Sequence, residues 1–197
     1  MSHSTSGHVI IVMGPTGSGK GTLMKYARNA VPDLYQTVSC TTRDPRPNEV
    51  DGIDYYFISK NEFETKIESG DFLEWAIFSG NHYGTLRSEI VLRLDAGQVV
   101  LTEIEIQGVE QLKAILPSSA MTVVYVEAGN WDVLRSRALA RSPISDVELE
   151  KRKERYDIEI KAKPIADVVI DNTSDDFTSA CEEFANLINT VIQTSNQ

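Results

Sequence analysis

The sequence predicts an α/β fold in which a parallel sheet carries helices on both of its faces. Apolar runs of strand length alternate with stretches of helical period along most of the chain. An aromatic-rich segment, residues 35–84, departs from that alternation and predicts a mixed or antiparallel insertion on the parallel core. The 197 residues suffice for one domain with a sizeable core.

The first predicted elements surround a Gly-rich turn. Val9–Met13 is an apolar run rich in β-branched residues and predicts a buried strand, and the helix that follows the turn ends at Pro32. Ser59 and Glu62 have the spacing of a capping box, so a second helix is expected from Ser59 until Gly70.

The rest of the chain returns to alternating helices and strands. A helix over residues 86–94 precedes the next strand, because apolar residues recur there at helical spacing. Three strands are predicted from continuous apolar runs at 99–101, 121–126 and 168–170. Residues 146–163 are dense in mixed charge and predict a largely solvated helix, and a final helix is expected from about Ser174.

Charge and cysteine content exclude several classes of function. Lysine and arginine number 19 against 29 aspartate and glutamate residues, so the formal net charge is −10. An acidic surface repels phosphate polymers and anionic lipids, so we expect no nucleic acid polymer and no membrane as partner. Cys40 and Cys181 are too few for a disulfide framework and lack metal-ligand spacing. Residues 1–8 lack a secretory signal, so we expect a cytoplasmic protein, whose oligomeric state the sequence does not determine.

The Gly-rich turn after the first strand has the Gly-x-x-x-x-Gly-Lys spacing of a phosphate-binding loop. In chain order its residues are Gly14, Pro15, Thr16, Gly17, Ser18, Gly19, Lys20, Gly21 and Thr22. A strand leads in and a helix leads out, so backbone N–H groups converge on a phosphate chain that Lys20 can reach. A Gly-rich turn without a ligand is the alternative interpretation. Gly21 replaces the Ser or Thr that holds magnesium in this motif, and Thr22 follows one position later.

Arg43 and Arg46 form the next candidate site. Pro45 and Pro47 favour an extended backbone with three residues per turn, which places both guanidinium groups on one side. Two such groups repel each other unless an anion lies between them. The pattern therefore indicates a second phosphate site, with a solvated arginine pair as the alternative.

Five motifs, taken in chain order, resemble guanylate kinase. They are the phosphate loop and residues 39–46, 49–57, 72–76 and 80–85. The resemblance runs from about residue 9 to 172 and implies a nucleotide kinase with a helical lid. The reaction it implies is phosphorylation of GMP, and of dGMP, by ATP with Mg²⁺. Within a single domain, 1–197, it implies a core at about 9–36, 93–130 and 162–197, a GMP-binding insertion at about 37–92 and a lid at about 131–161.

The resemblance also implies a role for each matching residue of the insertion. By this resemblance the GMP phosphate contacts Arg43, Arg46, Tyr55 and Tyr83. Guanine is expected to contact Ser39, Glu74 and Thr85. Forked guanidinium groups and phenolic hydroxyls suit a dianionic phosphate, and a carboxylate suits the N1–H and N2–H donors of guanine.

The lid matches the family less closely. By resemblance, the arginines that close over the transferring phosphoryl group are Arg137, Arg141 and Arg152. Together with Lys20 and Arg43 they form the expected catalytic set. The family usually has glycine on both sides of the second lid arginine, where this chain has Ala140 and Ser142.

Two glutamates stand where the family commonly has aspartates. The resemblance implies that Glu103, together with Thr22, binds Mg²⁺ partly through water, and that Glu105 faces the bound GMP. Each side chain is one methylene longer than the aspartate it replaces, which changes the geometry of both contacts.

Two other functions use the same motifs. The first is a catalytically silent guanylate-kinase-like scaffold that binds partner peptides in the same groove, and the intact loop at Lys20 argues against it. The second is a related kinase that phosphorylates a sugar phosphate. Such an enzyme has no use for Ser39 and Glu74 as readers of guanine.

Overall fold

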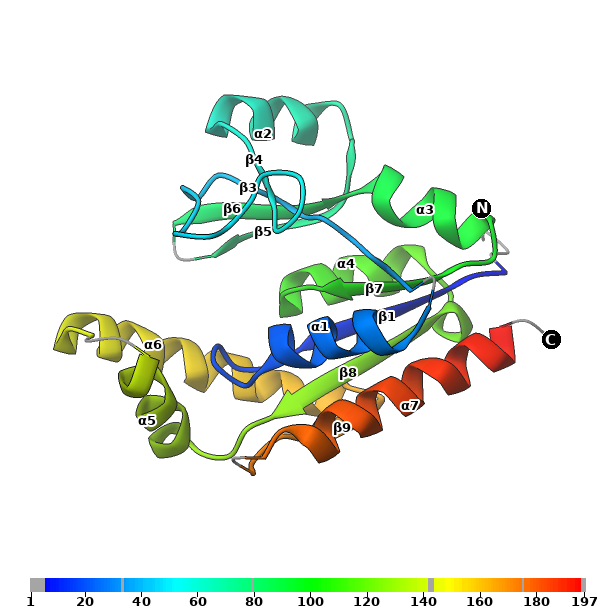
Figure 1. Cartoon of the computed structure of the whole chain (residues 1–197). Coiled ribbons are helices and arrows are strands. Elements are labelled where there is room, and N and C mark those ends of the chain that lie inside the picture. The colour runs from blue at the N-terminus through cyan, green and yellow to red at the C-terminus, as the bar shows by residue number, and fades with distance from the viewer. Residues whose placement is uncertain (1–5, 33, 79, 142–143, 175, 196–197) are drawn as a thin grey trace.

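The computed structural model describes residues 6–32, 34–78, 80–141, 144–174 and 176–195. Its core is a five-stranded sheet in the order β2-β7-β1-β8-β9, and every neighbouring pair in it is parallel (Figure 1). In that order the strands are Tyr35–Gln36, Val99–Glu103, His8–Met13, Met121–Glu127 and Val168–Asp171. The central position of β1 explains why its sequence is so apolar, since both of its faces are covered.

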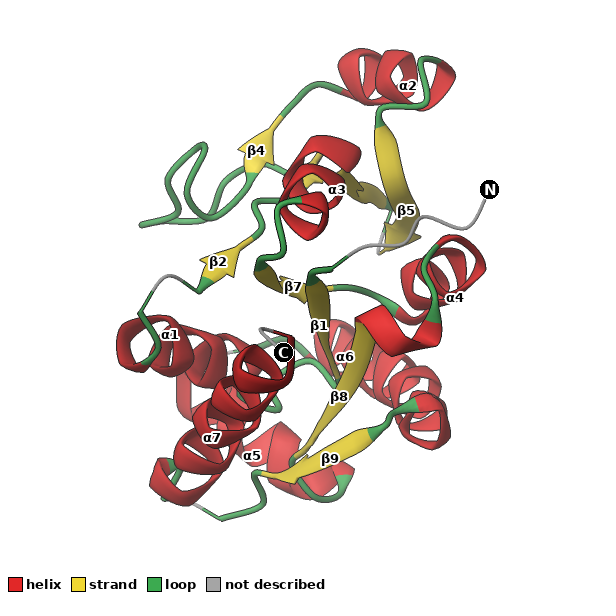
Figure 2. Cartoon of the chain, turned by 90° about the vertical axis from the view of Figure 1, so that its right-hand side faces the viewer, coloured by secondary structure: helices red, strands yellow, loops and turns green. Residues whose placement is uncertain are grey.

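Helices cover both faces of this sheet, as the alternation of patterns predicts. Residues Ile10 and Val12 of β1 pack with helices α1 and α7, whereas their neighbours Val9 and Ile11 pack with α3 and α4. Figure 2 shows α1 and α7 together on one side of the sheet and α4 on the other. These helices span Lys20–Ala30 (α1), Thr178–Ser195 (α7), Arg87–Asp95 (α3) and Ile106–Ile115 (α4). A short 3-10 helix, η1, spans Ser118–Ala120.

A second sheet of four strands, in the order β4-β3-β6-β5, lies apart from the core sheet. Its strands are Tyr56–Phe57 (β4), Cys40–Thr41 (β3), Asn81–Leu86 (β6) and Phe72–Phe78 (β5). The sheet is mixed, because β3 pairs with β4 in parallel while β6 runs antiparallel to both β3 and β5. Helix α2, Lys60–Glu68, packs on this sheet through Phe63, which stacks on Phe72 at 4.3 Å between ring centroids. The predicted capping box of Ser59 and Glu62 is confirmed.

Helices α5, Trp131–Arg141, and α6, Asp146–Glu159, form an arm that extends away from the sheet in Figure 1. A 3-10 helix, η2, continues α6 over Ile160–Ile165. Most of α6 is solvated, as its charge pattern predicts, and its buried residues are Leu149 and Glu159. The burial of a glutamate at the end of an otherwise exposed helix requires a partner in the core.

The final helix begins later than the sequence predicts. Helix α7 starts at Thr178 rather than at about Ser174, because two local side-chain bonds form a turn first. The N–H of Asp176 donates to Ser174 Oγ at 3.1 Å, and the N–H of Thr178 donates to Asp176 Oδ1 at 2.9 Å. Cys40 and Cys181 are both buried free thiols. Among the helices in the described ranges, none has the length and apolar character to cross a membrane.

Candidate active site

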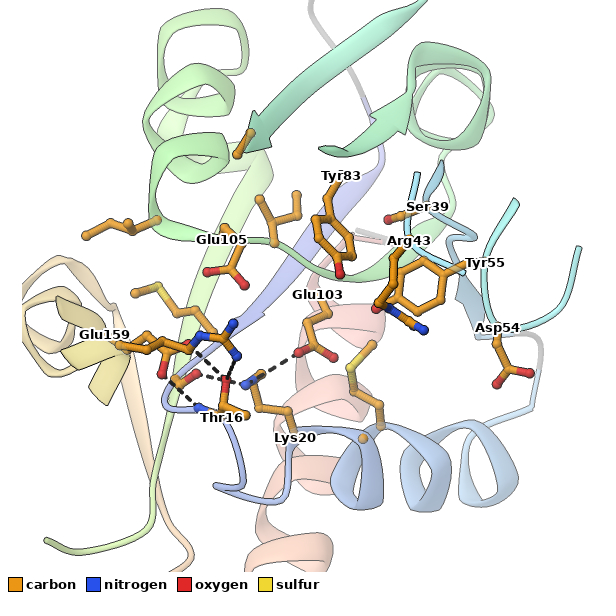
Figure 3. A pocket seen from close by; sticks show the side chains of 18 of the residues that line it. Thr16, Lys20, Ser39, Arg43, Asp54, Tyr55, Tyr83, Glu103, Glu105 and Glu159 are labelled. Atoms are coloured by element: carbon orange, nitrogen blue, oxygen red, sulfur yellow. Dashed lines mark hydrogen bonds and ion pairs between the residues drawn. The ribbon is translucent and has the colours of Figure 1, made fainter. Parts of the chain in front are cut away.

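A cleft of about 1160 Å³ opens at the carboxyl ends of β1 and β7 (Figure 3). The phosphate loop forms one wall, the second sheet and its loops form the opposite wall, and the last turns of α6 close one end. In open α/β sheets ligands bind outside the carboxyl ends of the strands, which is where this cleft lies.

The phosphate loop has the geometry that its glycines predict. Gly14, Gly17 and Gly19 have φ values of 140°, 90° and 96°, which side-chain-bearing residues rarely adopt. A side chain on Gly19 would also meet Asn172 Nδ2 at 2.4 Å. Gly19 is the N-cap of α1, and Gly19, Lys20 and Gly21 line the cleft, so the positive end of the helix dipole lies at the cleft.

Lys20 is held at the mouth of this loop. Its Nζ donates to the carbonyl oxygens of Gly14 at 2.8 Å and Pro15 at 3.2 Å, and it lies 3.4 Å from Glu103 Oε1. The ammonium therefore lies between the loop and the end of β7, as Figure 3 shows. A positive charge in this position can stabilise the terminal phosphates of a nucleotide on the loop.

Hydrogen bonds hold the phosphate loop on two sides. Below it, the buried Asn172 donates from Nδ2 to the carbonyl oxygen of Ser18 at 2.6 Å. On the side of α6, Glu159 accepts the N–H of Thr16 at 2.8 Å and the Thr16 hydroxyl at 3.1 Å. Sequence reasoning assigned no role to Glu159, because its partner lies 143 positions away in the chain.

Two of the predicted lid arginines, Arg137 and Arg152, do not line the cleft. Arg137 is bound to backbone carbonyls at the end of β9, at 3.2 Å from Asn172 O and 2.9 Å from Ser174 O. Arg152 pairs within α6 with Glu148, at 3.0 Å between Nε and Oε1. The side chain of Arg141 lies outside the part of the chain that the structure describes.

Another arginine of α6 occupies the position beside the loop. Arg155 lines the cleft, and its Nη1 donates to Thr16 Oγ1 at 3.3 Å. The sequence patterns did not single out Arg155, because its partner Thr16 lies 139 positions away in the chain.

The second sheet places a buried carboxylate at the predicted guanine position. Glu74 is 5% exposed, and its Oε1 accepts the Thr85 hydroxyl at 2.6 Å. Ser39 Oγ lies 3.3 Å from the same hydroxyl, so the three predicted guanine contacts meet. Gly108 makes room for this carboxylate, because a side chain there would meet Glu74 Oε2 at 2.2 Å. Burial raises the pKa of Glu74 to about 7, although its bonds from Thr85 favour the charged form.

The predicted phosphate contacts line the same cleft as Glu74. Tyr55 and Tyr83 pack edge to face at 6.0 Å, and the Arg43 guanidinium lies 5.5 Å from the Tyr55 ring centroid. Figure 3 shows Arg43, Tyr55 and Tyr83 grouped on one wall of the cleft. Arg46 also lines the cleft, with a side chain that is 72% exposed.

Glu49 orients these arginines and was not singled out by the sequence patterns. It accepts two hydrogen bonds from the Arg43 fork, each at 3.0 Å, and the Arg46 N–H at 2.7 Å. Partial burial disfavours the charged carboxylate of Glu49 and would raise its pKa. The hydrogen bonds from Arg43 and Arg46 have the larger combined effect, so the pKa of Glu49 is lowered. Arg43 Nε is buried and has no hydrogen-bond partner among the described residues.

Two glutamates at the end of β7 and just after it line the cleft. Glu105 projects into it from the start of α4, and Glu103 lies beside Lys20 (Figure 3). Desolvation raises the pKa of Glu105 to about 7, and repulsion by Glu159 adds to the increase. The described residues contain no group of three or more His, Cys, Asp or Glu that could hold a metal by themselves.

Comparisons with known proteins agree on one family. The family model described as guanylate kinase matches residues 6–191. A guanylate kinase of Trichormus variabilis is 40% identical over 178 residues, which cover 90% of this chain and 87% of that protein. A guanylate kinase of Rubrobacter xylanophilus is 39% identical over 186 residues, which cover 94% of this chain and 95% of that protein. The crystal structure of guanylate kinase from Anaplasma phagocytophilum confirms the fold, with a TM-score of 0.74 at 24% identity over 94% of this chain and 86% of that one.

Proposed function

The chain belongs to the guanylate kinase family, and we propose that it transfers the terminal phosphoryl group of ATP to GMP or dGMP within the cleft. The observation that carries this proposal is a buried, hydrogen-bonded carboxylate, Glu74, in the same cleft as a phosphate loop. The loop alone suits any nucleoside triphosphate. The carboxylate adds a site that selects the base of the acceptor.

We assign the guanine to Glu74, Thr85 and Ser39. An ionised Glu74 can accept the N1–H and N2–H of guanine, while the two hydroxyls reach a further polar edge. Adenine offers an acceptor at N1, which would face the lone pairs of a buried carboxylate. A site built on hydrogen bonds rejects such an analogue strongly, because a buried polar group loses its partner.

The acceptor phosphate is assigned to the opposite side of the same pocket. Its contacts are Arg43, Arg46, Tyr55 and Tyr83, and Glu105 faces the bound GMP. Glu49 holds the Arg43 fork before the ligand arrives, which reduces the entropy lost on binding. Arg43 lines the cleft, so its guanidinium can donate hydrogen bonds to the phosphate.

The donor is assigned to the phosphate loop, residues 14–22. A phosphate oxygen of GMP forms a bond to the terminal phosphorus of ATP while the bond between that phosphorus and the bridging oxygen breaks, and ADP leaves. The acceptor phosphate is already ionised near neutral pH, so no general base is required. Catalysis then consists of positioning and of charge stabilisation by Lys20.

Mg²⁺ fits the donors that this cleft offers. The Glu103 carboxylate and the Thr22 hydroxyl both line the cleft beside the loop. Because magnesium typically uses one or two protein oxygens together with phosphates and water, a larger protein cluster is not needed. Thr22 and Glu103 would hold the ion partly through water. When bound with ATP, the ion supplies neutralisation of charge on the terminal phosphates.

We further propose that the chain works as a core, a GMP-binding insertion at about 37–92 and a lid at about 131–161. In this proposal Arg137, Arg141 and Arg152 reach the phosphoryl group only when α5 and α6 move toward the loop, because Arg137 and Arg152 are bound elsewhere in the present arrangement. The partners are then small molecules. Two buried free thiols fit a cytoplasmic location, where thiols stay reduced.

A substrate panel tests the function. ADP formation is measured with ATP and, in turn, GMP, dGMP, AMP, CMP, UMP and ribose bisphosphate, and we expect activity with GMP and dGMP. The variant Glu74→Gln keeps the shape of the site but replaces one acceptor with a donor. Its kcat/KM for GMP should fall by at least about a hundredfold, and the ratio of kcat/KM for GMP to kcat/KM for AMP should become smaller.

Each other outcome of the panel points to a different function. No turnover with any acceptor would indicate a silent scaffold, and turnover with ribose bisphosphate alone would indicate a sugar-phosphate kinase. A third outcome is that Glu74→Gln folds as the parent does, by circular dichroism, and also keeps the parent's ratio of kcat/KM for GMP to kcat/KM for AMP. That result would mean that other residues recognise guanine.

A further inference from the structure

Glu159 is the last residue of α6 and reaches back into the core of the site. It is 8% exposed, and its two carboxylate oxygens accept the N–H and the hydroxyl of one loop residue, Thr16. Burial raises the pKa of this carboxyl, while the Thr16 N–H, Lys20 and Arg155 favour its charged form. A carboxylate withdrawn from water costs stability unless its partners offset the cost.

The contact lies where the lid meets the phosphate loop. Helix α6 projects from the sheet at its N-terminal end, whereas its last turn lies against the loop (Figure 1 and Figure 3). Arg155, one helical turn earlier, donates to the same Thr16 hydroxyl at 3.3 Å. The opposite side of the loop is held by Asn172, which belongs to the end of the core sheet. The loop is therefore tied to a fixed element on one side and to the lid helix on the other.

From this arrangement we propose that Glu159 is a positioning residue that couples the α5–α6 lid to the phosphate loop through Thr16. The proposal rests on the kinase function proposed above. Binding of ATP orders the loop. Through the paired bonds to Thr16, the last turn of α6 then becomes ordered as well. Conversely, a lid that closes carries Glu159 with it and sets the loop against the terminal phosphates.

Three variants separate this role from that of a simple structural tie. Glu159→Ala removes both bonds. Glu159→Gln keeps them, because the amide oxygen can accept the Thr16 N–H and the amide N–H can donate to the Thr16 hydroxyl. Thr16→Ala removes only the hydroxyl bond. Glu150→Ala, an exposed position on the same helix, is the matched control.

Kinetics give the first measurement. Glu159→Ala should raise the KM for ATP by about tenfold or more, since two hydrogen bonds to a charged acceptor are lost, and leave the KM for GMP within about twofold. Glu159→Gln and Glu150→Ala should stay within about threefold of the parent for both substrates. A parent-like KM for ATP in Glu159→Ala would overturn the proposal.

Amide hydrogen exchange gives a second measurement that needs no turnover. A non-hydrolysable ATP analogue should slow exchange over residues 146–155 in the parent and in Glu159→Gln but not in Glu159→Ala. If Glu159→Ala does not fold, Thr16→Ala decides. The proposal assigns the coupling to both bonds, so loss of the hydroxyl bond should weaken the slowing, and an undiminished slowing would overturn the proposal. A parent that binds the analogue without phosphorylating GMP would refute the kinase function and leave the coupling measurable.

Discussion

At the scale of single residues, Glu74 shows how a binding requirement opposes stability. Its pKa is raised from 4.5 to about 7 by burial, so the native state binds more protons than the unfolded state between those pH values. The contribution of Glu74 to stability therefore falls as the pH rises from about 4.5 through 7. Above pH 7 the full cost of the buried charge is present, and bound guanine is what would offset it.

The substitution Glu74→Gln should consequently stabilise the ligand-free protein at pH 8. The difference between 4.5 and about 7 corresponds to about 3 kcal/mol at most. Urea unfolding at pH 8 and pH 4 measures the effect, and the two proteins should agree at pH 4, where both side chains are neutral. Equal stabilities at pH 8 would mean that the carboxylate is solvated or paired with another charge.

Lys20 provides a second test at this scale. Lys20→Met keeps the backbone of the loop but removes the ammonium group. In the parent, this group lies 3.4 Å from Glu103 Oε1 and donates a hydrogen bond to the carbonyl oxygen of Gly14. Turnover should fall by about a hundredfold or more, as expected for the loss of one preorganised electrostatic contact, while circular dichroism stays unchanged. Turnover within threefold of the parent would show that this loop is not the catalytic cradle.

At the scale of secondary-structure elements, the insertion and the lid should respond differently to loss of an arginine. Arg43→Ala removes a side chain of the insertion and should raise the KM for GMP by about tenfold or more, with little effect on the KM for ATP. Arg137→Ala should lower kcat more than either KM, because in the proposal above Arg137 reaches the phosphoryl group only after α5 has moved.

Arg135→Ala is the control for the lid variant, since Arg135 is exposed on the same helix. Steady-state kinetics with each substrate varied in turn measure both effects. If Arg43→Ala bound GMP as the parent does, the assignment of the acceptor phosphate would be wrong. If Arg137→Ala and Arg135→Ala were both neutral, Arg137 would only brace the end of β9.

At the scale of the whole molecule, the phosphate loop depends on a core that lies outside the site. Helix α1 starts at the loop and packs with α7 in one apolar cluster, whose largest aromatic member is the fully buried Phe184. Phe184→Ala should lower the free energy of unfolding by about 3–5 kcal/mol, measured with urea. The fraction that remains folded should keep the parent's KM for both substrates, and a changed KM for ATP would show that α7 also sets the loop geometry.

The sequence by itself determined the features that are local along the chain. The strand, Gly-rich turn and helix around residues 8–30 follow from composition and spacing, and so does the capping box at Ser59. The insertion was recognisable from its aromatic strands. Spacing also located the candidate residues Lys20 and Arg43, whereas Glu74 followed only from the resemblance of its motif to the family.

Only the tertiary structure decided which of these side chains meet and which are buried. The burial of Glu74 depends on Thr85 and on the space left by Gly108, which come from different elements. The pairing of Glu159 with Thr16 joins residues 143 positions apart. No local pattern encodes such pairs, because the energy of a buried charge depends on the donors and the solvent that the whole fold places around it.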